Sequence, residues 1–407
     1  MGTSRSKHMP QALKDIDEFD QKTAAEYEEA FKSGGMSQLN KKIDADIDKW
    51  RNIPVNIAVT GNSGVGKSSF INSFRGLKAM SKDAAAVGVN ETTLEPTKYM
   101  HPNNNNIALW DLPGIGTEKF PKETYLEKVD FEKYDCFLII TANRFTENDI
   151  WLAKEVQNLK KKFFFIRTKM NTEVENNQND YGKSKSETVK EIQEDMTQQV
   201  TEKRFENVKV YLIDNRSDQD YDFPKLIEDM IKEAPKWKQE AMALTMTTLT
   251  EDLINRKRRA LRKRILIVAL GSAAGGTVPM PGASLAVDTA IIMKEVDIYK
   301  QQFGINDESL KKTASSLKQA FDNVKGGLRT GGATVAMISH FATTLAASEC
   351  AEKVTAFVLP VLGSIIAAGI SYGSTVSILR SLLDECVSDA RDINKQLKIK
   401  MSESNPS

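Results

Sequence analysis

The chain contains few cysteines and histidines, and their scarcity excludes several kinds of site. Its 407 residues include three of each. Cys136, Cys350 and Cys386 lie far apart and form no CxxC pair, so the sequence has neither a disulfide framework nor a cysteine zinc site. No two histidines have the spacing of metal ligands. This use of cysteine suits a reducing compartment.

An excess of charge of one sign is also lacking. The 56 Lys and Arg residues balance 55 Asp and Glu residues, which leaves a formal net charge of +1. That balance gives no support for a nucleic-acid partner. The first residues are polar and basic, without the apolar core of a signal peptide. We therefore expect a cytoplasmic protein.

The length corresponds to two or three domains of about 150 residues. Residues 1–50 are predicted to form a helical extension, with helices in Lys14–Ala30 and Met36–Trp50 separated by Ser33-Gly34-Gly35. Residues 51–237 alternate apolar runs of strand length with charged stretches of helical length. Residues 238–407 have no strand pattern, and we expect an all-helical domain there.

The alternation in the middle domain predicts a parallel sheet with helices on both faces. Five strands are predicted, at 53–60, 106–110, 135–141, 162–167 and 208–213. Helices are predicted between them, near 66–76, 147–160, 183–204 and 224–233. The polar run Asn103–Asn106 is predicted to be a turn that enters the second strand.

A phosphate-binding motif, GxxxxGK[ST], directly follows the first predicted strand and precedes a helix. It consists of Gly61, Asn62, Ser63, Gly64, Val65, Gly66, Lys67 and Ser68, and Ser69 extends the binding segment. The glycines let backbone N–H groups surround phosphates, and the helix N-terminus adds partial positive charge. Lys67 would reach the terminal phosphates, and Ser68 would supply an oxygen to Mg²⁺.

Asp111 and Gly114 belong to a DxxG sequence at the end of the second predicted strand. In this position Asp111 can hold Mg²⁺ through water, while the Gly114 amide can contact the γ-phosphate. Between this sequence and the phosphate loop lies Val89–Thr93, which has no regular pattern. A nucleotide switch needs such a segment, so Thr93 is a candidate Mg²⁺ ligand and Thr92 is the alternative.

A third candidate segment follows the strand at 162–167 and contains Thr168, Lys169 and Asn171. Guanine-binding GTPases usually have [NT]KxD here, and the aspartate accepts two hydrogen bonds from the base. An amide at Asn171 would lose a charge-assisted pair of about 1.5–3 kcal/mol, which puts guanine selectivity in doubt. Asn215, after the last strand, would help to frame the base. Many small GTPases have a glutamine directly after DxxG, but here that residue is Ile115, so a monomer should hydrolyse slowly.

Together these motifs resemble the immunity-related GTPases, the interferon-inducible family of cell-autonomous defence. The similar stretches are GNSGVGKSSFINSFRG, WDLPGIGT (110–117), YDCFLIITANRFTENDIWLAKEV (134–156), FFFIRTK (163–169), YDFPKL (221–226) and FGINDESL (303–310). The resemblance covers residues 50–310 well and continues more weakly through 382–390. Asn171 departs from the usual aspartate of this family.

The resemblance implies a Ras-like P-loop domain between an N-terminal helical segment and a C-terminal helical domain. With Lys67 in the sequence GKS, the chain resembles the effector branch of this family. Members bind GDP and GTP with Mg²⁺, self-associate through their nucleotide faces, hydrolyse GTP cooperatively and load onto membranes of pathogen-containing vacuoles. Glu91 matches a switch glutamate that contacts the partner molecule. The expected catalytic residues are therefore Lys67, Ser68, Glu91, Thr93 and Gly114.

Several features of the sequence indicate a membrane partner, each with an alternative. Met1-Gly2 begins an N-myristoylation pattern, or else a tail introduced by cloning. Arg256–Arg264 has seven basic residues in nine, either a solvated helix face or a contact for anionic lipid. Uncharged runs at Ile265–Val287, Thr330–Ser348 and Val354–Leu379 are either packed hairpins, hairpins that insert into a membrane, or constitutive spans.

The sequence thus predicts an immunity GTPase that oligomerises with GTP bound and associates reversibly with intracellular membranes. The alternative function is a nucleotide-gated membrane scaffold with negligible turnover or relaxed guanine specificity.

Overall fold

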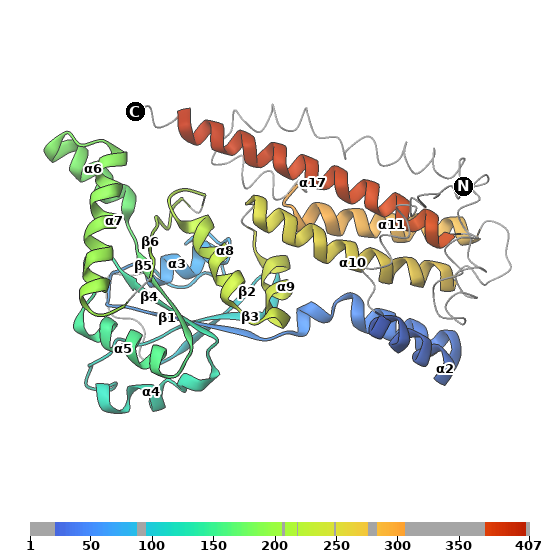
Figure 1. The fold of residues 1–407 in the computed structure, drawn as a ribbon, viewed down its shortest axis with the longest axis horizontal. Helices are drawn as coiled ribbons and strands as arrows, with labels where there is room; N and C mark the ends of the chain where they lie inside the picture. Colours follow the sequence, from blue (N-terminus) through green and yellow to red (C-terminus); the bar gives the residue numbers. More distant parts are fainter. Residues whose placement is uncertain are drawn as a thin grey trace, which may run out of the picture. The chain divides into compact units, whose positions relative to one another are not determined.

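The computed structural model describes residues 21–87, 95–205, 208–217, 219–247, 250–275, 283–305 and 371–403 (Figure 1). The chain divides into two compact units. The α/β unit lies within Trp50–Leu253, and the helical unit is formed by segments of Met1–Lys49 and Ile254–Lys398.

The α/β unit contains a six-stranded sheet in the order β2-β3-β1-β4-β5-β6. Its strands are β1 (Val55–Thr60), β2 (Thr97–His101), β3 (Asn104–Asp111), β4 (Cys136–Thr141), β5 (Lys162–Arg167) and β6 (Val210–Leu212). The pair β2–β3 is antiparallel and the other four pairs are parallel. This is the strand arrangement of a Ras-like domain, as predicted.

Continuous apolar strands allow helices to cover both faces of the sheet. All six residues of β4 are buried. One core cluster joins the sheet to α3 (Lys67–Phe74) and α8 (Phe223–Glu233). The clusters on the other face include residues of α4 (Tyr125–Lys128), α5 (Glu147–Asn158) and α7 (Lys185–Glu202). The predicted parallel sheet with helices on both faces is therefore confirmed.

The four predicted helices of this unit all exist, as α3, α5, α7 and α8. Capping boxes explain two of the starts, since Thr146 pairs with Asp149 before α5 and Ser184 pairs with Glu187 before α7. Sequence patterns did not indicate α4 or α6 (Met170–Tyr181), nor the 3₁₀ turns η2 (Lys49–Asn52), η3 (Lys122–Thr124) and η4 (Phe131–Lys133). The helix α9 (Lys236–Thr245) falls almost entirely within the part predicted to be all helical, but it belongs to the α/β unit.

The prediction of five strands was wrong by one, because β2 was not recognised. This strand lies at the edge of the sheet, and three of its five residues are exposed, so it has no apolar run. The predicted turn at Asn103–Asn106 was also misplaced: the turn occupies residues 102–103, and β3 begins at Asn104. Asn104 is tolerated there because its buried amide donates to the Thr245 hydroxyl at 3.4 Å.

The helical unit contains α2 (Gln21–Ile47), most of α10 (Glu251–Gly275), α11 (Ala283–Gln302) and much of α17 (Ser371–Glu403). As predicted, α2 is interrupted at Gly34 and Gly35, which have non-helical backbone angles. The expectation of an all-helical C-terminal part is confirmed for the residues that the structure describes. Within those residues, no helix is long and apolar enough to cross a bilayer.

Candidate functional site

The phosphate loop connects β1 to α3, and its glycines adopt conformations that other residues rarely reach. Gly61, Gly64 and Gly66 have φ angles of 142°, 77° and 96°. Gly61 also passes so close to β4 that a Cβ atom would clash with the carbonyl oxygen of Ile140. The first helical hydrogen bond of α3 runs from the Phe70 N–H to the Gly66 carbonyl oxygen at 2.9 Å. The backbone N–H groups of this first turn point away from the helix, where helix N-termini commonly bind anions.

Lys67 folds back over this loop. Its Nζ atom donates to the carbonyl oxygens of Gly61 at 2.8 Å and Asn62 at 3.1 Å. Ser68 and Ser69 are half-buried in the first turn of α3, whereas Asn62 and Ser63 are exposed. The predicted phosphate-binding residues thus form one continuous loop with an ammonium group above it.

Asp111 ends β3 next to the start of this loop. It pairs with Val59 of β1, and its side chain is buried. The residue after it, Leu112, donates its N–H to the Val59 carbonyl oxygen at 2.9 Å. The Asp111 carboxylate at the end of β3 and the Ser68 hydroxyl in the first turn of α3 are hard oxygen donors of the kind that Mg²⁺ prefers. Glu91, Thr92 and Thr93 lie outside the described residues.

The segment after Asp111 is held by side chains from α4 and α5. The Tyr125 hydroxyl donates to the Pro113 carbonyl oxygen at 3.0 Å, and the Asn148 amide donates to the Ile115 carbonyl oxygen at 2.9 Å. The Ile115 side chain packs against an apolar cluster of the sheet. Gly114 lies between these two fixed points. Sequence patterns did not indicate Tyr125 or Asn148, because their contacts depend on tertiary structure.

Thr168 supports the phosphate loop from within the protein. Its hydroxyl donates to the Val65 carbonyl oxygen at 2.5 Å and is also 3.2 Å from the Thr141 carbonyl oxygen. The side chain is completely buried, so it braces the loop from the core. Lys169 is exposed and has a left-handed backbone, with φ of 62°.

Asn171 takes part in a polar cluster that the sequence did not reveal. Its backbone N–H donates to Asp214 Oδ2 at 3.0 Å. Its side-chain Oδ1 accepts a hydrogen bond from the Tyr221 hydroxyl at 2.8 Å, and Nδ2 donates to Ser217 Oγ at 3.4 Å. Burial raises the pKa of Tyr221, so its hydroxyl remains a donor. A left-handed φ of 51° at Tyr221 fits the turn that brings this ring toward Asn171.

Asn215 brings the segment after β6 against the phosphate loop. Its Nδ2 atom donates to the Gly66 carbonyl oxygen at 3.0 Å, and its own carbonyl oxygen accepts a hydrogen bond from Ser73 of α3. Within the described part of the chain, Asn215 Oδ1 is buried and has no hydrogen-bond partner. The structure therefore gathers three predicted segments, at Val65–Gly66, Thr168–Asn171 and Asn215, around one site.

A comparison of the sequence with known families agrees with this arrangement. The profile of the interferon-inducible GTPases (IIGP) matches residues 20–397. The chain belongs to the interferon-inducible GTPase family. It is an immunity GTPase, and the resemblance inferred from its motifs is confirmed.

The sequence is similar to those of named relatives, and the fold was compared with a solved structure. It is 35% identical over 325 residues to T-cell-specific guanine nucleotide triphosphate-binding protein 2 of Mus musculus, over 79% of this chain and 77% of that protein. It is 31% identical over 370 residues to Interferon-inducible GTPase 5 of Rattus norvegicus, over 89% of this chain and 80% of that protein. A GTP-binding protein from Sulfolobus solfataricus in complex with GDP is 16% identical, with a TM-score of 0.27, over 55% of this chain and 66% of that one.

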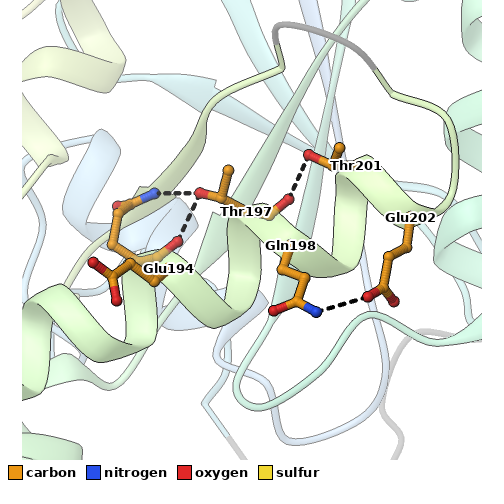
Figure 2. Close-up of a pocket in the computed structure, with 6 residues that line it drawn as sticks. Glu194, Thr197, Gln198, Thr201 and Glu202 are labelled. Atoms are coloured by element: carbon orange, nitrogen blue, oxygen red, sulfur yellow. Dashed lines mark hydrogen bonds between the residues drawn. The ribbon is translucent and has the colours of Figure 1, made fainter.

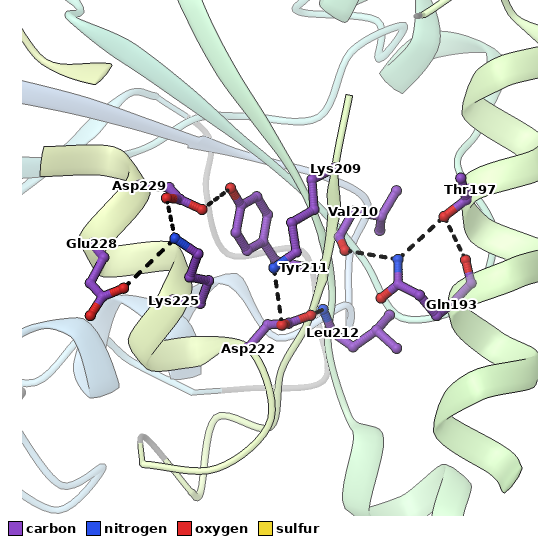
Figure 3. A network of polar contacts seen from close by, with 10 residues as sticks. All are labelled: Gln193, Thr197, Lys209, Val210, Tyr211, Leu212, Asp222, Lys225, Glu228 and Asp229. Atoms are coloured by element: carbon purple, nitrogen blue, oxygen red, sulfur yellow. Dashed lines mark hydrogen bonds and ion pairs between the residues drawn. The ribbon is translucent and has the colours of Figure 1, made fainter. Parts of the chain in front are cut away.

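A polar network fixes the last strand of the GTPase domain and the segment that carries Tyr221 (Figure 3). Asp222 accepts the Leu212 N–H at 3.0 Å and forms an ion pair with Lys209 at 3.2 Å. The Tyr211 hydroxyl donates to Asp229 at 2.9 Å, and Lys225 pairs with the same carboxylate at 2.6 Å. These contacts join β6 to α8, and so hold the intervening segment in place.

A depression of about 420 Å³ lies on the surface of α7 (Figure 2). Its lining residues are Gln193, Glu194, Thr197, Gln198, Thr201 and Glu202. None of them is a predicted site residue of the GTPase, and the two carboxylates would repel a phosphate group. This depression is therefore not assigned to the nucleotide.

The basic cluster of the helical unit is largely directed toward the protein itself. Arg264 forms two 2.8 Å hydrogen bonds with Glu295, and Lys257 donates to the Gln302 carbonyl oxygen at 2.5 Å. Arg258 and Arg262 both pair with Asp384, at 2.8 and 3.6 Å. Only two of the seven basic side chains are exposed, those of Arg259 and Lys263. A fully solvated helix face therefore does not describe this cluster, and contact of its exposed residues with anionic lipid stays a prediction.

The uncharged runs are described only in part. At the start of the first run, Ile265, Leu266, Val268, Ala269 and Leu270 are buried within the structure. This burial supports the packed alternative for that segment. Gly2, residues 330–348 and the first part of the run at 354–379 lie outside the described residues.

Proposed function

We propose that this protein binds GTP with Mg²⁺ and hydrolyses it to GDP and phosphate in self-associated complexes on intracellular membranes. The observation that carries the nucleotide proposal is the enclosure of the phosphate loop. Thr168 and Asn215 contact its carbonyl oxygens from two other loops, and Lys67 covers it from a third side. These contacts brace the loop in a conformation whose glycines let backbone N–H groups surround a polyphosphate.

The residues at the loop have distinct roles in this proposal. Lys67 stabilises negative charge on the terminal phosphates, and the α3 amides bind the phosphate oxygens. Ser68, Asp111 and Thr93 would hold Mg²⁺, which neutralises charge that develops on the phosphates during the reaction. The Gly114 amide contacts the terminal phosphate.

Ile115 supports the proposal that self-association completes the site. Its carbonyl oxygen is bound by Asn148 and its side chain packs in an apolar cluster. An aliphatic side chain cannot orient an attacking water. We propose that a group from a second copy, contacted through Glu91, supplies this function in a nucleotide-dependent dimer.

The enzymatic proposal is tested by GTP hydrolysis with Mg²⁺ and with excess chelator. Lys67→Ala should lower kcat/KM by about 10- to 100-fold, because a charge-assisted contact is lost. Lys190→Ala, an exposed lysine of α7, is the matched control and should leave the rate unchanged. Undiminished hydrolysis by Lys67→Ala, or full activity in the chelator, would contradict the proposal. Nucleotide-dependent self-association without any turnover would favour the scaffold function instead.

We further propose that the protein is cytoplasmic and binds anionic membranes reversibly. The exposed Arg259 and Lys263 beside an uncharged sequence support this. In flotation with phosphatidylserine vesicles, reversing both charges to Glu should reduce the bound fraction. Reversal of exposed Lys154 and Lys190 in the α/β unit is the control. Equal flotation of the two double variants would argue against this surface.

A further inference from the structure

The amide at Asn171 is committed to contacts within the protein. Tyr221 donates to its Oδ1 at 2.8 Å, and its Nδ2 donates to Ser217 at 3.4 Å. Tyr221 is itself next to Asp222, which is bonded to β6 through the Leu212 N–H. Guanine-binding GTPases usually have a carboxylate at this position that binds the base. Here the side chain is neutral, and both its oxygen and its nitrogen are bonded within the protein.

A carboxylate nevertheless lies in direct contact with this residue. Asp214 Oδ2 accepts the Asn171 N–H at 3.0 Å, and Oδ1 accepts the Arg216 N–H at 2.9 Å. The side chain is buried. A carboxylate offers about four acceptor sites, so two backbone donors leave further capacity on both oxygens.

The neighbours of Asp214 along the chain place it beside the predicted nucleotide site. The next residue, Asn215, bonds to the Gly66 carbonyl oxygen of the phosphate loop. Asp214 itself bonds to the first turn of α6, directly after Lys169 and Met170. It therefore joins the two segments between which a bound base must lie.

The chemistry of the base then favours this carboxylate over the amide. Guanine presents two adjacent donors, N1–H and the exocyclic amine, so its complement is a group that only accepts. The Asn171 amide would set its own NH₂ against one of these donors. We propose that Asp214, and not residue 171, supplies the carboxylate that selects guanine. A neutral residue at 171 also avoids repulsion between two adjacent carboxylates.

This inference rests on the proposed nucleotide binding and is tested by comparing GDP with XDP, in which a carbonyl replaces the exocyclic amine. Direct titration of the Mg²⁺-loaded full chain should show that wild type binds GDP at least about tenfold more tightly than XDP. Asp214→Asn should lower this GDP/XDP preference by about 10- to 100-fold. The double variant Asn171→Asp/Asp214→Asn should restore the GDP/XDP preference, since it places a carboxylate at residue 171 of α6.

The preference is a ratio, so it separates specificity from structural damage. Asp195→Asn, an exposed acid-to-amide change on α7, is the control and should leave the ratio unchanged. Wild type that prefers XDP or binds both equally would overturn the inference, even if Asp214→Asn did not fold. An unchanged ratio in Asp214→Asn, including equal loss of both ligands, would also overturn it while leaving the GTPase proposal intact. If wild type bound neither nucleotide, the proposed function would fail as well.

Discussion

The side-chain amide of Asn148 donates a 2.9 Å hydrogen bond to the carbonyl oxygen of Ile115. This contact joins the first turn of α5 to the segment that follows Asp111 and carries Gly114. Asn148 also lies beside Gly116, since a Cβ atom added there would be 3.0 Å from Asn148 Nδ2. Asn148 therefore sets the path of the backbone that is expected to contact the γ-phosphate.

Removal of this hydrogen bond should loosen the Gly114 segment. We predict that Asn148→Ala lowers kcat for GTP by about three- to tenfold, the equivalent of one hydrogen bond of about 1 kcal/mol, while GDP affinity changes little. Asn158→Ala, an exposed residue near the other end of α5, is the control. Single-turnover hydrolysis and GDP titration measure the two effects. A parallel loss of GDP binding would show that Asn148 supports the whole site instead.

Gly61 should tolerate no side chain. Gly61→Ala combines an unfavourable φ of 142° with a clash against the Ile140 carbonyl oxygen. Gly182→Ala is the matched control, because its φ is 66° and no atom lies within 4 Å of the added Cβ. The control should lose about 1–2 kcal/mol of stability, the cost of an alanine in the left-handed region, and Gly61→Ala should lose more and also lose GDP binding. Thermal unfolding and nucleotide titration compare them, and equal behaviour would be inconsistent with the close packing at Gly61.

The buried ion pair of Arg264 and Glu295 should be costly to break from one side. Both side chains are almost fully buried. Arg264→Met should destabilise the helical unit by about 3–5 kcal/mol, because it leaves an uncompensated carboxylate, and Arg264→Met/Glu295→Leu should recover part of that loss. Arg258→Met breaks a more exposed pair with Asp384 and should cost about 0–1 kcal/mol. Denaturant unfolding gives the three values, and an Arg264→Met cost no larger than that of Arg258→Met would refute the ranking.

Lys257 should make the stability of the helical unit depend on pH. Burial lowers the pKa of Lys257 to about 7. Above that pH only the unfolded state holds the proton, up to the ordinary lysine pKa of about 10.4, so stability rises with pH across this window. Lys257→Met should remove about 2 kcal/mol of the rise between about pH 7 and 9.

Urea titrations at several pH values measure how the free energy of unfolding changes with pH. Lys263→Met, an exposed neighbour on α10, should leave it unchanged. The same slope in wild type and Lys257→Met would show that Lys257 does not titrate in this range.

The sequence patterns predicted the parts of the fold that depend on local composition. Strands β1, β3, β4 and β5 are apolar runs, and the phosphate loop is set by glycines at fixed spacing. The edge strand β2 was not predicted, because most of its residues are exposed and it therefore has no apolar run. The solvated-face prediction for the basic cluster failed at Arg264 and Lys257, since charge alone does not reveal that these two side chains are buried and bonded within the helical unit.

The base side of the site could be predicted only in part. The motif located Thr168, Lys169 and Asn171, but the Thr168 hydroxyl braces the loop from the core. The contacts of Asn171 with Asp214 and Tyr221 span 43 and 50 residues of sequence. Such contacts arise from packing of β5, β6 and α6, and no local pattern encodes them.

We propose that turnover is cooperative, because the Ile115 side chain, directly after the DxxG sequence, cannot itself orient an attacking water. The most direct measurement is the initial rate of GTP hydrolysis per molecule as a function of protein concentration, with Mg²⁺ and saturating GTP. The rate per molecule should rise with concentration and level off once complexes are fully formed. A rate per molecule that stays constant over the whole range would contradict the claim.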